Sequence, residues 1–160
     1  MRLIVAAVGR LKSGPERALF AKYAERCTAA GKGQAIAPIA WQEIAESRAS
    51  AAAQRRAEEA AGLLKATANA DVLIALDERG EMVTSVAFAR LIGRIRDEGA
   101  KAAGLLIGGA DGLGVSVAER ARYRLSFGAI TLPHQLARVV LAEQLYRAAT
   151  ILSGHPYHRD

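Results

Sequence analysis

The sequence predicts an α/β fold with a mostly parallel sheet flanked by helices. Short apolar runs of strand length alternate along the chain with longer amphipathic stretches of helical periodicity. This alternation is typical of parallel sheets built from strand–helix–strand units. The chain has 160 residues, the length of one ordinary domain. Because no linker, repeat or low-complexity block divides it, we expect one domain over residues 1–160.

The expected strands are short apolar runs bounded by polar residues or glycine. The first run, LIVAAV, is continuously apolar, as in a strand that is buried on both faces. The second run is weaker, and the last is the shortest. In order, the expected strands cover residues 3–8, 34–40, 71–76, 102–107 and 125–127. Residues 77–83 are polar, so we expect them to form a loop.

The expected helices carry apolar faces at helical spacing or signals at their ends. Ser13 and Glu16 have the spacing of a capping box, and Pro15 stands early in the first turn. Gly31 and Gly33 are expected to end that helix. In order, the expected helices cover about residues 15–31, 47–66, 84–98, 115–121 and 134–153.

Composition predicts a basic, cytoplasmic protein. Hydrophobic residues make up 51% of the chain and charged residues 24%, and the formal net charge is +6. A positive charge favours a polyanionic partner, although many small basic proteins bind nothing anionic. Cys27 is the only cysteine, which excludes an intramolecular disulfide and fits a reducing compartment. No stretch approaches the ~20 apolar residues of a membrane span, so we expect no membrane association.

The last expected helix is apolar on two faces, so it needs two partners. One face carries Ala137, Leu141, Leu145, Ala148 and Leu152, and the other carries Leu136, Val140 and Ile151. The sheet can cover the first face. We expect the same helix of a second copy to cover the other, which predicts a homodimer. The alternative is a helix that is sandwiched within a monomer.

Two glycine-rich stretches invite nucleotide-binding interpretations that fail on their details. Gly9 and Gly14 have the outer spacing of a Walker A loop, but Pro15 stands where lysine is needed. The second stretch, LIGGADGLG at residues 106–114, lacks the third glycine of a dinucleotide fingerprint. Its position after a strand still suits a ligand, because glycine lets a ligand approach the backbone closely. The alternative is a tight turn.

The three histidines do not predict a metal site. His155 and His158 have one adjacent aspartate and no cysteine nearby, which makes them poor zinc ligands. His134 follows Pro133 at an expected helix start, where packing or capping is its ordinary role. No Ser-His-Asp arrangement is identifiable. We therefore expect neither a metal ion nor chemistry that depends on a strong side-chain nucleophile.

Several segments resemble a known family. They are LIGGADGL, the run LSFGAITLPHQLARVVLAEQLYRA at residues 125–148, the ending HPYHR and the segment LDERGE. Together these resemble the RlmH family of SPOUT-class methyltransferases, over nearly the whole chain and most densely from Leu105 onward. The combination is specific, although each piece alone would be weak.

The resemblance implies an activity, a substrate and an assembly. It implies methyl transfer from S-adenosylmethionine to N3 of a pseudouridine in 23S rRNA, in the large-subunit stem-loop that bridges to the small subunit. The expected substrate is the assembled 70S ribosome, with no DNA partner. The resemblance also implies a homodimer whose C-terminal part is tied in a trefoil knot. General topology rules argue against knots, so the knot is expected on the resemblance alone.

The resemblance places the methyl donor against three loops, mostly through backbone contacts. The expected donor-binding residues are Leu76, Gly108, Phe127, Gly128, Ala129, Ile130, Thr131 and Leu132. Two positions depart from the family's pattern, since Gly128 stands where serine is common and Glu81 where lysine is common. The first change removes a hydroxyl contact, and we expect the second to weaken a phosphate contact.

The candidate catalytic residues lie mostly in the C-terminal tail. N3 of pseudouridine must lose a proton, so a base or a cation would help the reaction. His158 is the candidate base, and Tyr157 is expected to stack on the target base. Arg159 or Arg138 is expected to hold a phosphate or the base carbonyl. The alternatives are a disordered tail and a reaction that needs no dedicated base.

Two other functions fit parts of the sequence. A ribosome-binding protein without chemistry would share the basic charge and the fold, but it does not explain a glycine loop suited to a ligand. A SPOUT enzyme that modifies transfer RNA is the other alternative. The compact chain has no appended RNA-binding domain, which favours a substrate already shaped by the ribosome.

Overall fold

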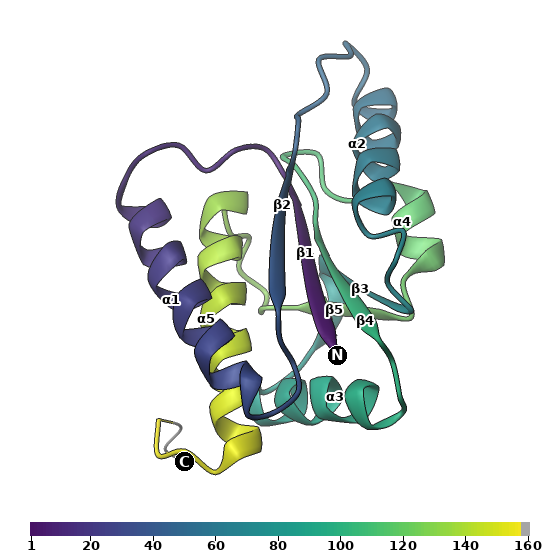
Figure 1. Cartoon of the computed structure of the whole chain (residues 1–160). Coiled ribbons are helices and arrows are strands. Elements are labelled where there is room, and N and C mark those ends of the chain that lie inside the picture. Colours follow the sequence, from purple (N-terminus) through teal and green to yellow (C-terminus); the bar gives the residue numbers. More distant parts are fainter. Residues whose placement is uncertain (158–160) are drawn as a thin grey trace.

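The computed structural model describes residues 1–157 and contains a five-stranded, all-parallel sheet (Figure 1). Its strand order is β2-β1-β4-β3-β5. The strands are β1 (Arg2–Val8), β2 (Ile39–Ile44), β3 (Val72–Met82), β4 (Ala102–Ile107) and β5 (Tyr123–Ser126). The helices are α1 (Pro15–Lys32), α2 (Ala52–Ala66), α3 (Ser85–Asp97), α4 (Val115–Arg120) and α5 (His134–Ser153). The predicted α/β class with a parallel sheet is confirmed.

Helices cover both faces of the sheet. In Figure 1, α1 and α5 lie side by side on one face, and α2 and α4 lie together on the other. Side chains of β1 alternate between the two apolar clusters, with Leu3 and Val5 in one and Ala6 and Val8 in the other. Both faces of β1 are therefore buried, which explains why its sequence is continuously apolar.

The buried thiol of Cys27 belongs to the cluster beneath α1 and α5. The residue is 0% exposed, and burial raises the pKa of its thiol to about 12. A thiol that stays protonated is a poor nucleophile. Cys27 therefore acts as a small core residue.

Three local predictions are wrong. The second strand covers residues 39–44 instead of 34–40, because the chain leaving α1 forms a turn in which Ile36 N donates to the Gly31 carbonyl. Gly14 precedes the first residue of α1 and no side chain caps this helix, so Ser13 does not form the predicted capping box. The α2 helix begins at Ala52, five residues after the predicted start at Ser47.

The prediction of a loop at residues 77–83 is also wrong, because most of this polar segment belongs to a strand. Strand β3 continues through it to Met82, with a shift in register between Leu76 and Glu81. Leu125 of β5 pairs with both of these residues, so the segment between them bulges out of the sheet. Pairing with a strand more than forty residues later gives this segment a structure that its polar sequence does not indicate.

The α5 helix packs between α1 and α3, so other helices of the same chain cover part of its second apolar face. Val140 and Ile151 are half-buried, while Leu136 at the start of the helix is 41% exposed. The homodimer and the knot stay predictions. Among the described residues, no helix is long and apolar enough to cross a membrane.

Candidate functional site

The sheet brings the three predicted donor-binding segments to one edge. Strands β4, β3 and β5 are neighbours and run parallel, so their carboxyl ends meet at the same edge. Leu76 ends the first part of β3, Gly108 follows β4, and residues 127–132 follow β5. Ligands of open parallel sheets bind at this edge. The predicted residues are therefore close enough to form one site, and their contact with a donor stays a prediction.

The glycine loop, residues 108–114, is folded back tightly on itself. Gly109 and Gly112 form an antiparallel bridge, and the Gly112 amide donates to the Gly109 carbonyl at 3.0 Å. A Cβ atom on Gly108 would lie 2.7 Å from the carbonyl carbon and oxygen of Gly112. Because any side chain at this position would collide with backbone, the loop requires glycine here. The glycine at 108 therefore lets the loop fold back onto its own backbone.

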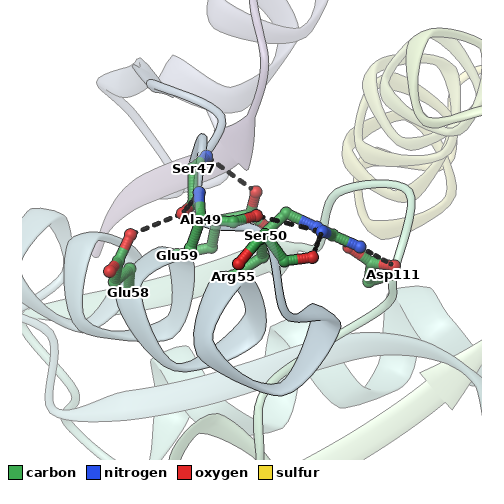
Figure 2. A network of polar contacts seen from close by, with 7 residues as sticks. All are labelled: Ser47, Ala49, Ser50, Arg55, Glu58, Glu59 and Asp111. Carbon is green, nitrogen blue, oxygen red and sulfur yellow. Dashed lines mark hydrogen bonds and ion pairs between the residues drawn. The ribbon is translucent and has the colours of Figure 1, made fainter.

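An ion pair holds this loop to the opposite side of the site (Figure 2). Arg55 of α2 binds both carboxylate oxygens of Asp111, with N–O distances of 2.6 and 3.1 Å. The same guanidinium donates to the backbone carbonyls of Ala49 and Ser50 at 3.0 and 2.8 Å. The hydrogen bond from Arg55 lowers the pKa of Asp111 below its ordinary value. Arg55 thus joins the glycine loop to the segment that precedes α2.

Glu59 faces the glycine loop from the next turn of α2. Its Oε1 accepts the Ser47 amide at 3.0 Å, as Figure 2 shows. Its Oε2 is buried and has no hydrogen-bond partner among the described residues, and the residue is 6% exposed. This oxygen lies 2.9 Å from the position that a Cβ on Gly109 would take. A buried carboxylate oxygen therefore borders the loop.

The third donor segment, residues 127–132, is open. The Ser126 hydroxyl donates to the Gly128 carbonyl at 2.8 Å and accepts the Gly128 amide at 3.2 Å. Beyond this turn the side chains lie at the surface, and Ile130 is 81% exposed. The exposed residues of the segment are Phe127, Ala129, Ile130 and Thr131. Apolar groups at the surface beside a predicted ligand site indicate a surface that something else covers.

Arg138 points into the protein. It is 2% exposed, and its Nη2 donates to the carbonyls of Val8 and of Gly9, the latter at 2.8 Å. Its Nη1 lies 3.4 Å from Oε1 of Glu43. Burial lowers the pKa of Arg138, and the charges of Glu43 and Glu46 oppose this shift. In this arrangement the guanidinium holds the end of β1, and its predicted contact with a phosphate or a base carbonyl stays a prediction.

Tyr157 packs against α5, away from the donor edge. Its hydroxyl donates to Glu143 at 3.2 Å, and its ring centroid lies 4.6 Å from that of Tyr146. Burial is the largest of the effects that raise the pKa of Tyr157 to about 12. In Figure 1 the C-terminal end of α5 lies opposite the carboxyl ends of the strands. His158 and Arg159 lie outside the described residues, so the predicted catalytic roles of the tail stay predictions.

The site contains residues that sequence reasoning did not select. Asp111 is the only acidic residue of the glycine loop, which is a signal that could have been used. Its partner Arg55 is 56 positions away, and no local pattern connects the two. Within residues 1–157, no group of three or more histidine, cysteine, aspartate or glutamate side chains could hold a metal ion.

Comparison with known proteins identifies the family. Residues 1–158 match the family model described as "Predicted SPOUT methyltransferase". A protein of Rhizobium leguminosarum bv. trifolii named "Ribosomal RNA large subunit methyltransferase H" is 54% identical over 159 residues, which cover 99% of each chain. A protein of the same name from Bradyrhizobium diazoefficiens is 53% identical over the same share of each chain.

Solved structures agree on the fold. A probable methylase family protein of Haemophilus influenzae aligns with a TM-score of 0.51 at 14% identity, over 99% of this chain and 70% of that one. A probable methyltransferase of Bordetella pertussis also has a TM-score of 0.51, at 16% identity, over 92% of this chain and 95% of that one. The chain thus belongs to the SPOUT methyltransferase family and, within it, to the RlmH family.

Proposed function

We propose that the protein transfers a methyl group from S-adenosylmethionine to N3 of a pseudouridine in 23S rRNA. The target lies in the large-subunit stem-loop that bridges to the small subunit, and the substrate is the assembled 70S ribosome. Family membership makes the chain a methyltransferase, and relatives more than half identical over their full length are named as large-subunit rRNA methyltransferases. The nucleotide, the atom and the ribosomal context rest on the resemblance described above.

The glycine loop is the observation that carries the proposal. Its tight fold depends on Gly108, where a Cβ atom would collide with the Gly112 carbonyl, and a compact backbone loop after a strand fits a donor held by backbone groups. Leu76, Gly108 and residues 127–132 would hold S-adenosylmethionine at the carboxyl edge. The donor supplies a methyl group already activated on a sulfonium. The chain's own task is to align it with the acceptor, and alignment can contribute ~7–11 kcal/mol.

We propose that the working form is a homodimer of one-domain chains. Leu136 at the start of α5 is 41% exposed, and Phe127 and Ile130 add apolar surface in the segment before it. This apolar surface lies at the donor edge, where a second copy would bury it. Light scattering at working concentration should give the mass of two chains, and a single-chain mass would contradict the dimer.

The first test is methylation of ribosomes from a strain that lacks the equivalent enzyme. The protein is incubated with labelled S-adenosylmethionine, and the label is mapped by mass spectrometry. We expect label on one pseudouridine of the large subunit in whole ribosomes. Gly108→Ala, with folding checked by thermal unfolding, serves as the donor-site control and should transfer much less label than the wild type at limiting donor concentration.

Other outcomes would select another function. Label on transfer RNA in place of ribosomal RNA would indicate the transfer-RNA enzyme. No transfer and no donor binding by calorimetry would indicate a ribosome-binding protein without chemistry. The tail is tested separately, because full turnover by His158→Ala would exclude His158 as the base.

A further inference from the structure

Three side chains converge on Gly9, at the carboxyl end of β1. A Cβ atom on Gly9 would lie 2.7 Å from Oε1 of Glu46, and 3.3 Å from both Nε2 of His134 and Nη2 of Arg138. Gly9 has a φ of +87°, a conformation that side chains disfavour. A carboxylate, an imidazole and a guanidinium therefore border one small space that glycine keeps open.

This Gly9 cluster lies between two of the predicted donor segments. Strand β1 pairs with β4 through Ala7 and Ile107, so the ends of both strands lie next to each other. Cγ1 of Val8 is 3.0 Å from the position of a Cβ on Gly109, which places the end of β1 against the glycine loop. On the other side, only Pro133 separates His134 from the donor segment 127–132.

The three side chains of the cluster differ in exposure. Arg138 is buried and fixed by the carbonyls of Val8 and Gly9, so its charge cannot leave the site. Glu46 is exposed and His134 is half-buried, so a bound base can reach the imidazole from solvent. An imidazole that solvent can reach can act as a general base, and a carboxylate that borders the same space can stabilise the imidazolium that forms.

We propose that His134 is a further catalytic residue, which takes the N3 proton of the target base while Glu46 stabilises its protonated form. This inference rests on the proposed methylation of N3. In the step, the bond between sulfur and the methyl carbon breaks and its electron pair stays on sulfur. The lone pair of N3 forms the new bond to carbon. The N3 proton passes to a ring nitrogen of His134 and then to water, so atoms and charge balance.

The test compares His134→Gln and His134→Ala with the wild type in single-turnover methylation of ribosomes. A lost general base lowers the rate by about 10²–10⁴-fold. We expect this fall with donor affinity and melting temperature unchanged, and we expect added imidazole to restore rate to His134→Ala. Glu46→Gln should give a smaller fall. The matched control is Glu25→Gln, since Glu25 is exposed on α1 and should not affect the rate.

Two results would overturn the inference alone. In the first, His134→Gln keeps its rate within about threefold of the wild type. In the second, the rate falls together with donor affinity or melting temperature and imidazole restores nothing, which would make His134 a structural residue. If the wild type itself methylates no pseudouridine, the proposed function fails and the inference fails with it.

Discussion

The glycine loop and segment 127–132 lie at the same edge of the sheet, yet they are held in very different ways. The loop is fixed by its own bridge, by close packing at Gly108 and by the ion pair between Asp111 and Arg55. The segment has one turn at Ser126, and Ile130 is 81% exposed. One part of the donor site is thus formed in advance, and the other gains most of its contacts when a ligand or a second copy covers it.

The largest effect on donor affinity is expected from Gly108→Ala, which changes the preformed glycine loop. The new methyl group would meet the Gly112 carbonyl, and overpacking of this kind costs ~1–3 kcal/mol. If the loop must shift to relieve it, donor affinity falls by about 10- to 100-fold. Isothermal calorimetry measures the change. Gly33→Ala is the control, because its Cβ would meet only the Ala30 carbonyl at 3.9 Å, and equal affinities for both variants would contradict a preformed loop.

A smaller effect is expected from Arg55→Ala, which keeps the loop but frees it from α2. An ion pair near the surface contributes modestly, so we expect about a fivefold loss of donor affinity. The double variant Arg55→Asp with Asp111→Arg should recover part of it, a result that simple damage to α2 would not give. Arg96→Ala removes the comparable pair with Asp97 and is the control. Unchanged affinity in Arg55→Ala would show that the pair does not position the loop.

The same ion pair predicts how acid acts on the site. The pKa of Asp111 is lowered in the folded protein, so the pair is fully present above the ordinary aspartate value of about 3.9. It is lost as the pH falls through the lowered folded value. Donor affinity of the wild type should therefore decline in that acidic window, and that of Asp111→Asn should lack this component. Identical pH profiles would contradict the assignment.

The smallest effect on stability is expected from Ile130→Ser, in the open segment. Because this side chain is largely exposed in the single chain, the free energy of urea unfolding, measured at a dilution that keeps the chains apart, should change by no more than about 0.5 kcal/mol. Ile92→Ala, at a residue that is 0% exposed, should cost ~2–5 kcal/mol and is the control. A large loss of stability in Ile130→Ser would mean that the segment is already packed in the free protein.

Local sequence signals predict some elements well and fail at others for physical reasons. The β4 strand and the α5 helix have the expected bounds, because each depends on its own uninterrupted pattern. The β3 extension to Met82 depends on pairing with β5, which no local pattern reveals. Ser13 has the right spacing for a cap, but Gly14 takes the position before the helix.

The site divides in the same way. Backbone-binding loops follow from the glycines and from strand ends, so Leu76, Gly108 and residues 127–132 could be named from the sequence. Arg55 binds Asp111 across 56 positions, and His134 and Glu46 border the same space at Gly9 only because α5 begins beside the end of β1. Such encounters depend on how helices pack on the sheet. The same packing turns Arg138 inward, where its guanidinium donates a hydrogen bond to the Gly9 carbonyl.

The single thiol on the buried side of α1 can report how often this part of the fold opens. Cys27 lies on the buried side of α1 and its pKa is raised to about 12, so a thiol reagent can modify it only when α1 separates from the core. The rate of modification therefore measures how often the layer formed by α1 and α5 separates from the sheet. The α5 helix begins at His134, beside the predicted donor segment. A donor or a second copy that stabilises this end of α5 should therefore lower the rate of Cys27 modification without contacting the thiol.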